Sequence, residues 1–270
     1  YELIDTEQKP IFTLGPIIHN EGVVADLEAR GVHVIAEADL DSPGDTLQNG
    51  TVVIRSHGVG KPIYDKLKEK NISYVDVTCP FVLKIHRIVE KESLAGNHII
   101  IIGDKDHPEV QGICGWCQGP YTVIRNKEEA EVFVPPKGKK ISIVSQTTFN
   151  YNKFKDLVEI LCKKRYDNNV LNILNILNTI CNATEERQRE AKNIAGEVDT
   201  MLVVGGRHSS NTQKLFEICK KECGNTYYIQ TPVDLDSEMF QCSSYVGITA
   251  GASTPNKIIE EVQEHVRIKF

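Results

Sequence analysis

Two hydrophobic patterns alternate along the chain. Short runs such as 51–54, 141–144 and 201–204 are apolar on both faces, as are strands of a parallel sheet that helices cover. Between these runs lie stretches with apolar residues at every third or fourth position, which predict amphipathic helices. The predicted helices cover 22–30, 63–70, 81–94, 152–164, 185–197 and 212–221. The alternation of strands and helices indicates an α/β fold.

The order of these elements repeats three times. The apolar runs that end at Gly103 and Gly205 lie 102 positions apart, and Cys79 and Cys181 are separated by the same 102 positions. An earlier copy ends its first run at Gly15, 88 positions before Gly103. A period of this kind indicates one supersecondary unit present in several copies. The predicted α/β units are 1–78, 79–177 and 178–270.

Small polar loops follow the predicted strands in every copy. Ligands of open parallel sheets bind at the carboxyl ends of the strands, where free backbone N–H groups and helix dipoles favour an anion. The copies therefore predict one shared anion site built from their strand ends. Its candidate donors are His19, His57, His107, Ser209, Ser210, Asn211 and Ser253. For any one serine alone, helix N-capping is the favoured alternative.

Cys79 and Cys181 stand at equivalent points of two copies, each at the predicted start of a helix. This position lowers the pKa of a thiol and favours thiolate. Buried structural cysteines are the usual alternative, but the equivalence favours metal ligation. The same offsets place a third cysteine near position −9 or −10, just upstream of Tyr1, so the chain is expected to begin after a lost segment. Three thiolates would leave one iron of a cubane cluster open to substrate.

A rival metal or redox motif lies at Cys114-Gly115-Trp116-Cys117. A zinc site would need a second pair of ligands with suitable spacing, and the sequence has none. A thioredoxin-type pair follows a strand directly, whereas this pair follows the turn at His107. We therefore predict that six cysteines pack in the core. They are Cys114, Cys117, Cys162, Cys219, Cys223 and Cys242.

The composition excludes two classes of protein. A formal net charge of −6 and a pI near 5.8 argue against a sequence-independent nucleic-acid binder. No run approaches the roughly 20 apolar residues of a membrane helix, and no secretory signal opens the chain. We therefore expect a cytoplasmic protein that binds neither nucleic acid nor membrane and that holds any anion through local groups.

The polar motifs stand in a fixed order from end to end. They are His19-Asn20, Ser56-His57-Gly58-Val59, Thr78-Cys79-Pro80, His107-Pro108-Glu109-Val110, Ser145-Gln146-Thr147-Thr148, Asn178-Thr179-Ile180-Cys181-Asn182-Ala183-Thr184, Ser209-Ser210-Asn211 and Thr249-Ala250-Gly251-Ala252-Ser253. This set resembles the motifs of the 4-hydroxy-3-methylbut-2-enyl diphosphate reductases. The resemblance implies a trefoil of three α/β domains around a central 4Fe–4S cluster held by three cysteines.

The resemblance also implies residue roles. Cys79 and Cys181 would be cluster ligands, with the third ligand upstream of Tyr1. Glu109 and Thr147 would deliver the proton. The residues that would bind the diphosphate are His19, His57, His107, Thr148, Ser209, Ser210, Asn211 and Ser253.

The implied reaction is reductive dehydroxylation of 4-hydroxy-3-methylbut-2-enyl diphosphate to isopentenyl and dimethylallyl diphosphate. The substrate hydroxyl would bind the open iron, and ferredoxin or flavodoxin would supply the electrons. Two features depart from the family pattern: its first motif, Gly-Phe-Cys-x-Gly-Val, is absent, and residues 171–178 repeat Leu-Asn-Ile in tandem. The alternative function is a non-redox phosphate-binding protein or phosphoester hydrolase, in which the histidines hold phosphate or a metal and both cysteines are core thiols.

Overall fold

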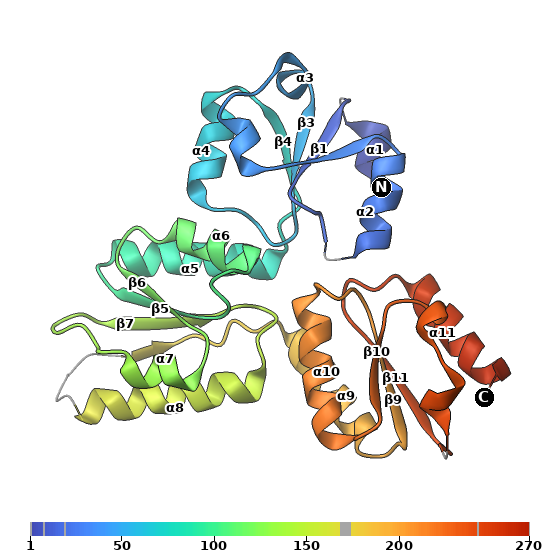
Figure 1. Ribbon diagram of the computed structural model, residues 1–270. Helices are drawn as coiled ribbons and strands as arrows, with labels where there is room; N and C mark the ends of the chain where they lie inside the picture. Colours follow the sequence, from blue (N-terminus) through green and yellow to red (C-terminus); the bar gives the residue numbers. More distant parts are fainter. Residues whose placement is uncertain (1, 8, 19, 168–173, 242, 270) are drawn as a thin grey trace. The chain divides into compact units, whose positions relative to one another are not determined.

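The computed structural model describes residues 2–7, 9–18, 20–167, 174–241 and 243–269. This part of the chain holds two four-stranded sheets and one three-stranded sheet, all parallel, with helices packed on them (Figure 1). The α/β fold expected from the hydrophobic pattern is confirmed. Each sheet lies within one of the three predicted ranges, while the boundaries of those ranges stay a prediction.

The chain forms two compact units. One unit comprises Tyr1–Ile17 and Val24–Ile180, and the other comprises Ile18–Val23 and Cys181–Phe270. The first unit holds both four-stranded sheets, and the second holds the three-stranded sheet.

The first sheet has the strand order β2-β1-β3-β4. Its strands are β1 (Ile11–Leu14), β2 (Val32–Ile35), β3 (Thr51–Ile54) and β4 (Ser73–Asp76), and its helices are α1 (Glu2–Thr6), α2 (Glu21–Ala29), η1 (Glu37–Leu40), α3 (Asp45–Gln48) and α4 (Lys61–Glu69). Val52 and Ile54 of β3 pack with Leu67 of α4, whereas Val53 packs in a second cluster with Leu27 of α2. Because neighbouring residues of β3 face opposite layers, the whole strand is buried.

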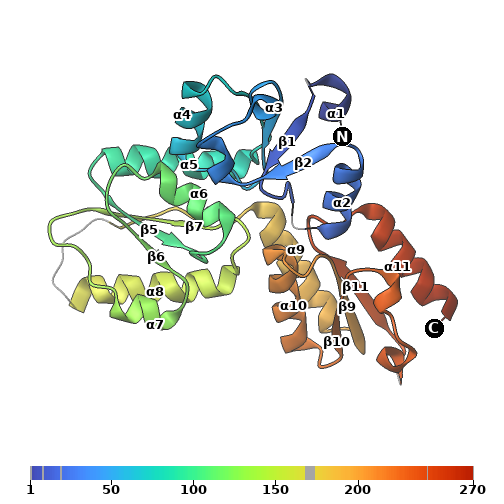
Figure 2. The ribbon, with the colours of Figure 1, turned by 45° about the horizontal axis from the view of Figure 1, so that its top comes forward.

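The second sheet has the order β6-β5-β7-β8. Its strands are β5 (His98–Ile102), β6 (Tyr121–Ile124), β7 (Ile141–Ser145) and β8 (Leu174–Ile176), and its helices are α5 (Pro80–Leu94), α6 (Pro108–Trp116), α7 (Lys127–Val132) and α8 (Tyr151–Asp167). Helices α5 and α6 lie side by side on one face, and α7 and α8 lie on the other (Figure 2). The isoleucines of β5 divide between these layers, with Ile99 and Ile101 in one cluster and Ile100 and Ile102 in the other.

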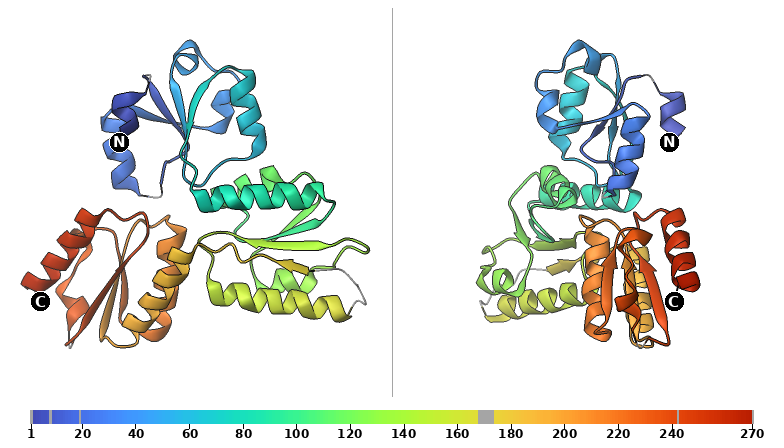
Figure 3. Two further views of the ribbon diagram at one scale, coloured as in Figure 1. Left: turned by 180° about the vertical axis from the view of Figure 1, so that it is seen from behind. Right: turned by 45° about the vertical axis from the view of Figure 1, so that its right-hand side comes forward.

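The third sheet has the order β10-β9-β11. Its strands are β9 (Thr200–Val204), β10 (Thr226–Ile229) and β11 (Val246–Ala250), and its helices are α9 (Asn182–Ala195), α10 (Ser210–Glu222), η2 (Pro232–Asp234), η3 (Ser237–Phe240) and α11 (Asn256–Lys269). Helices α9 and α10 cover one face and α11 covers the other (Figure 3). Met201 packs toward α9 and α10, and Leu202 packs toward α11.

The six predicted helices are confirmed as α2, α4, α5, α8, α9 and α10, with ends that differ by up to three residues. Part of the tandem repeat forms β8, while residues 171–173 lie outside the described residues. Among the described residues, no helix is long and apolar enough to cross a membrane.

Candidate functional site

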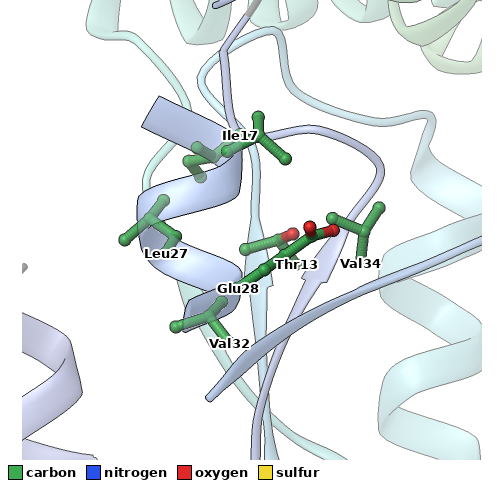
Figure 4. A pocket seen from close by; sticks show the side chains of 7 residues that line it. Thr13, Ile17, Leu27, Glu28, Val32 and Val34 are labelled. Atoms are coloured by element: carbon green, nitrogen blue, oxygen red, sulfur yellow. The ribbon is translucent and has the colours of Figure 1, made fainter. Parts of the chain in front are cut away.

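The predicted site residues that the structure describes lie at strand ends and helix starts, and none of them lines the hollow found on a sheet face. A small hollow of about 10 Å³ lies between α2 and the first sheet (Figure 4). Its lining includes Thr13, Ile17, Leu27 and Val32, and none of the predicted site residues. A cavity of this size holds about one water molecule. It is too small for a diphosphate ligand.

His57 and His107 come together in the first unit. His57 follows β3, and His107 follows β5 as the N-cap of α6. The two ring centres lie 5.4 Å apart with the rings nearly perpendicular, at 76°. The Nδ1 atom of His107 accepts a hydrogen bond of 3.1 Å from the backbone N–H of Glu109, which fixes its orientation. Two strand ends therefore present a pair of imidazoles at one place.

Glu109 lies in the first turn of α6, yet its carboxylate does not cap that helix. One carboxylate oxygen accepts a hydrogen bond of 2.6 Å from the backbone N–H of Thr147, and the other accepts one of 2.7 Å from the Thr147 hydroxyl. The residue is 1% exposed. The N-cap of this helix is His107.

Burial raises the pKa of Glu109 from 4.5 to about 7, although the two hydrogen bonds from Thr147 act in the opposite direction. A carboxyl with such a pKa exists in both protonation states near neutral pH. It can therefore hold and release a proton in the pH range where enzymes work.

The thermal unfolding midpoint (Tm) of the protein is expected to be lower at about pH 8 than at about pH 5, and Glu109 contributes to this decrease. The raised pKa means that the folded state keeps a proton that the unfolded state releases. This contribution is fully present below the ordinary pKa of 4.5 and is lost as pH rises through about 7. Thermal unfolding of Glu109→Gln at both pH values should show a weaker dependence, and an equal dependence would contradict the raised pKa.

Gln146 connects the ends of β5 and β7. Its side-chain carbonyl accepts a hydrogen bond of 3.2 Å from the backbone N–H of Asp104, and its amide donates one of 3.0 Å to the hydroxyl of Thr148. Gln146 is 2% exposed. It therefore fixes the loop that carries Thr147 and Thr148. The sequence motif included Gln146 but gave it no role.

The second unit presents its donors at the start of α10. Ser209 is the N-cap, and its hydroxyl accepts a hydrogen bond of 3.3 Å from the backbone N–H of Thr212. Ser209 therefore caps helix α10, which is the alternative role that its residue type suggested. Asn211 is 5% exposed, and both polar atoms of its side chain are buried without a hydrogen-bond partner in the described chain. Ser210, between them, is half-buried.

The loop after β11 packs against this first turn. A Cβ at Gly251 would lie 1.9 Å from the hydroxyl of Thr212, so only glycine allows this approach. Ser253, two residues later, has a buried hydroxyl without a hydrogen-bond partner in the described chain. Its carbonyl accepts a 3.4 Å hydrogen bond from the side-chain amide of Asn20, which lies 233 positions earlier in the sequence.

Cys79 and Cys181 occupy equivalent local positions, one in each unit. They are the N-caps of α5 and α9, and both are half-buried free thiols. The backbone N–H of Cys79 donates a 3.0 Å hydrogen bond to the carbonyl of Ser56, which ties it to the loop of His57. Before Cys181, the Thr179 hydroxyl accepts from the N–H of Ser145 and donates to its carbonyl, at 2.7 and 2.6 Å. Both thiols thus stand at fixed helix starts.

The other described cysteines have different surroundings. Cys219 and Cys223 are buried in the core between α9 and α10, and Cys114 and Cys117 pack beside α5. Burial raises the pKa of Cys117 and of Cys219 to about 12, which keeps both as thiols. Cys162 on α8 is half-buried. His19 and Cys242 lie outside the described residues, and the described residues contain no group of three or more side chains able to hold a metal.

Comparisons with known proteins cover nearly the whole chain. The family model described as "LytB protein" matches residues 1–267. The "4-hydroxy-3-methylbut-2-enyl diphosphate reductase" of Caldanaerobacter subterraneus is 45% identical over 98% of this chain and 88% of its own. The protein of the same name from Alkaliphilus oremlandii is 46% identical over 98% of this chain and 90% of its own.

Solved structures give the same result. A structure of "(E)-4-Hydroxy-3-methyl-but-2-enyl Diphosphate Reductase, the Terminal Enzyme of the Non-Mevalonate Pathway" is 36% identical, with a TM-score of 0.69 over 98% of this chain and 91% of the other. The "E-1-hydroxy-2-methyl-but-2-enyl-4-diphosphate reductase from Plasmodium falciparum" is 28% identical, with a TM-score of 0.88 over 99% of this chain and 80% of the other. The chain belongs to the LytB protein family.

Proposed function

We propose that this chain is an oxidoreductase of the non-mevalonate isoprenoid pathway that removes the hydroxyl of 4-hydroxy-3-methylbut-2-enyl diphosphate. The products are isopentenyl and dimethylallyl diphosphate. The allylic C–O bond breaks and the hydroxyl leaves with one proton as water, while two electrons and a second proton form the new C–H bond. The observation that carries the proposal is a family match over 1–267 with relatives named for this reductase.

The diphosphate would be held by donors at strand ends and helix starts. Asn211 and Ser253 support this assignment because their buried polar atoms lack partners. An unpaired buried polar group is costly unless a ligand or water satisfies it. His57 and His107 add imidazoles in the first unit, and the start of α10 adds backbone N–H groups. His19, Thr148, Ser209 and Ser210 complete the proposed set.

Asn211→Ala and Ser253→Ala are each expected to weaken pyrophosphate binding by roughly 1–3 kcal/mol. The reason is that each change removes a buried donor that has no other partner in the described chain. Isothermal titration with pyrophosphate measures the effect. Ser237→Ala, at an exposed position in η3, is the control and should bind normally. Unchanged binding in both site variants would place the anion elsewhere.

Cys79 and Cys181 would hold a 4Fe–4S cluster together with the third cysteine expected upstream of Tyr1. Their chemistry fits, because both are free, half-buried thiols at helix starts and cysteine sulfur is the usual protein ligand of iron–sulfur clusters. When bound, a cluster with three protein thiolates supplies electrons and an iron able to take the substrate hydroxyl. Ferredoxin or flavodoxin would reduce it, in a compartment such as the cytoplasm that keeps thiols reduced.

Glu109 would deliver the proton that forms the new C–H bond. Its pKa of about 7 allows it to be protonated at the working pH. Thr147 holds both carboxylate oxygens through two hydrogen bonds. The pair would therefore keep the proton donor in one orientation while the diphosphate fixes the substrate.

The rival function is a non-redox phosphate-binding protein or phosphoester hydrolase. Two measurements on anaerobically purified full-length protein separate the two functions. The proposed reductase should be brown, with broad absorbance near the blue edge of the visible spectrum, and should release no inorganic phosphate from its substrate. A colourless protein that releases phosphate without a reductant would establish the hydrolase instead.

A further inference from the structure

His86 is a buried histidine with no polar partner. It lies on α5, is 1% exposed, and neither ring nitrogen makes a hydrogen bond within the described chain. Burial lowers its pKa to about 4, so the ring is neutral at physiological pH. Leaving polar atoms unpaired in the core is costly. The contacts of the ring must therefore explain its position.

The His86 ring stacks on Trp116, the single tryptophan of the sequence. The ring centres are 5.2 Å apart and the planes differ by 18°. Trp116 is the last residue of α6, and its indole N–H donates a 2.9 Å hydrogen bond to the carbonyl of Val59. The stack thus joins α5 and α6 and fixes the chain two residues after His57.

The loop of His57 also fits directly against the stack. Gly58 has a positive φ of 68°, and a Cβ there would lie 2.7 Å from Cε1 of His86. A Cβ at Gly115 would lie 2.6 Å from Cα of Gly60, so α6 and the loop approach through two glycines. A side chain at these positions would separate the loop from the helices. The backbone on both sides of Val59 is therefore held by α5 and α6.

Helix α6 consequently acts on the histidine pair from both ends. Its N-cap is His107, whose ring centre lies 5.4 Å from that of His57. Its last residue is Trp116, which donates a hydrogen bond to the loop of His57. A shift of either end would change how the two imidazoles face each other. This rigid support matters because a binding group must be held within a fraction of an ångström of its working position.

We propose that His86 and Trp116 are positioning residues of the anion site: their stack fixes the loop 56–60 and so holds His57 against His107. This inference rests on the proposed function, because it takes His57 as a diphosphate-binding residue. The two residues do not touch the ligand. They act through the backbone of Gly58 and Val59.

Pyrophosphate binding to the full-length protein tests the stack by titration calorimetry. His86→Ala removes the stacked ring. Trp116→Phe removes the indole N–H that donates a hydrogen bond to the carbonyl of Val59. Each change should weaken pyrophosphate binding about tenfold. His86→Phe keeps a stacked aromatic ring and should bind within about twofold of the unmodified protein. The matched control is His98→Phe, because His98 is a buried histidine of the same unit that bonds to Thr122 at 2.9 Å, away from this loop. Its binding should be unchanged.

Trp116 fluorescence gives a readout that a role in stability alone would not produce. Because Trp116 is the single tryptophan of the 270 residues, the emission of this indole should shift on pyrophosphate addition and saturate with the calorimetric affinity. His57→Ala should weaken binding and abolish the shift. Normal binding by His57→Ala would overturn the role of His57 itself. If His57→Ala binds weakly but His86→Ala and Trp116→Phe bind normally, or if emission in the unmodified protein does not respond, the positioning role is wrong.

Discussion

Glu109→Gln is expected to lose most of its reductase turnover, by roughly 10²–10⁴-fold, while it binds substrate almost as well as the unmodified protein. Glutamine keeps the shape of the side chain and can still accept from the backbone N–H of Thr147, which now lies 2.6 Å from the carboxylate. It cannot supply a proton. Because the lost group acts in the reaction and not in binding, kcat should fall and KM should change little.

Steady-state kinetics and pyrophosphate titration of the same preparation measure both quantities. Glu92→Gln is the matched control, since Glu92 of the same unit also accepts a hydroxyl hydrogen bond, at 2.7 Å from Ser142. That variant should keep nearly normal turnover. Near-normal turnover of Glu109→Gln would assign its carboxylate a structural role and exclude it as the proton donor.

Cys79→Ser and Cys181→Ser are each expected to abolish turnover and to lower the iron and acid-labile sulfide content of anaerobically purified protein. The reason is that a serine hydroxyl is a poor replacement for a thiolate ligand of iron. Fold should be retained, because both positions are half-buried helix N-caps and serine is favoured there. The measurement is iron and sulfide per chain, in protein that carries the expected upstream cysteine.

Cys162→Ser is the control for these variants. Cys162 is also a half-buried free thiol, but it lies in the middle of α8 and not at a helix start. It should keep its iron, sulfide and turnover. Full iron content in Cys79→Ser or Cys181→Ser would show that the thiol concerned is not a ligand.

The parts of the fold that depend on local pattern were predictable from the sequence. Strand β3 was expected over the range that it occupies because its four residues are all β-branched and three of them are apolar. Cys79 and Cys181 were expected at helix starts because each precedes an amphipathic stretch at the same repeat offset, and both are N-caps. The repeated pattern was informative because each copy must bury its sheet in the same way.

Side-chain contacts between distant segments were not predictable. Nothing local indicated that Asn20 donates to the carbonyl of Ser253 across 233 positions, or that His86 stacks on Trp116. The helix pattern around His86 says only which face of α5 is buried. Ser209 could not be separated from an ordinary N-cap by its residue type, and the structure shows it capping α10. These pairings depend on how the layers pack.

Turnover of 4-hydroxy-3-methylbut-2-enyl diphosphate is the most direct test of the central claim. Full-length protein, purified anaerobically and supplied with reduced methyl viologen, should convert the substrate to isopentenyl and dimethylallyl diphosphate without release of inorganic phosphate. Omission of the reductant should stop the reaction, because two electrons are consumed for each product molecule. Recovery of unchanged substrate, or formation of inorganic phosphate alone, by protein with its full iron content would contradict the assignment.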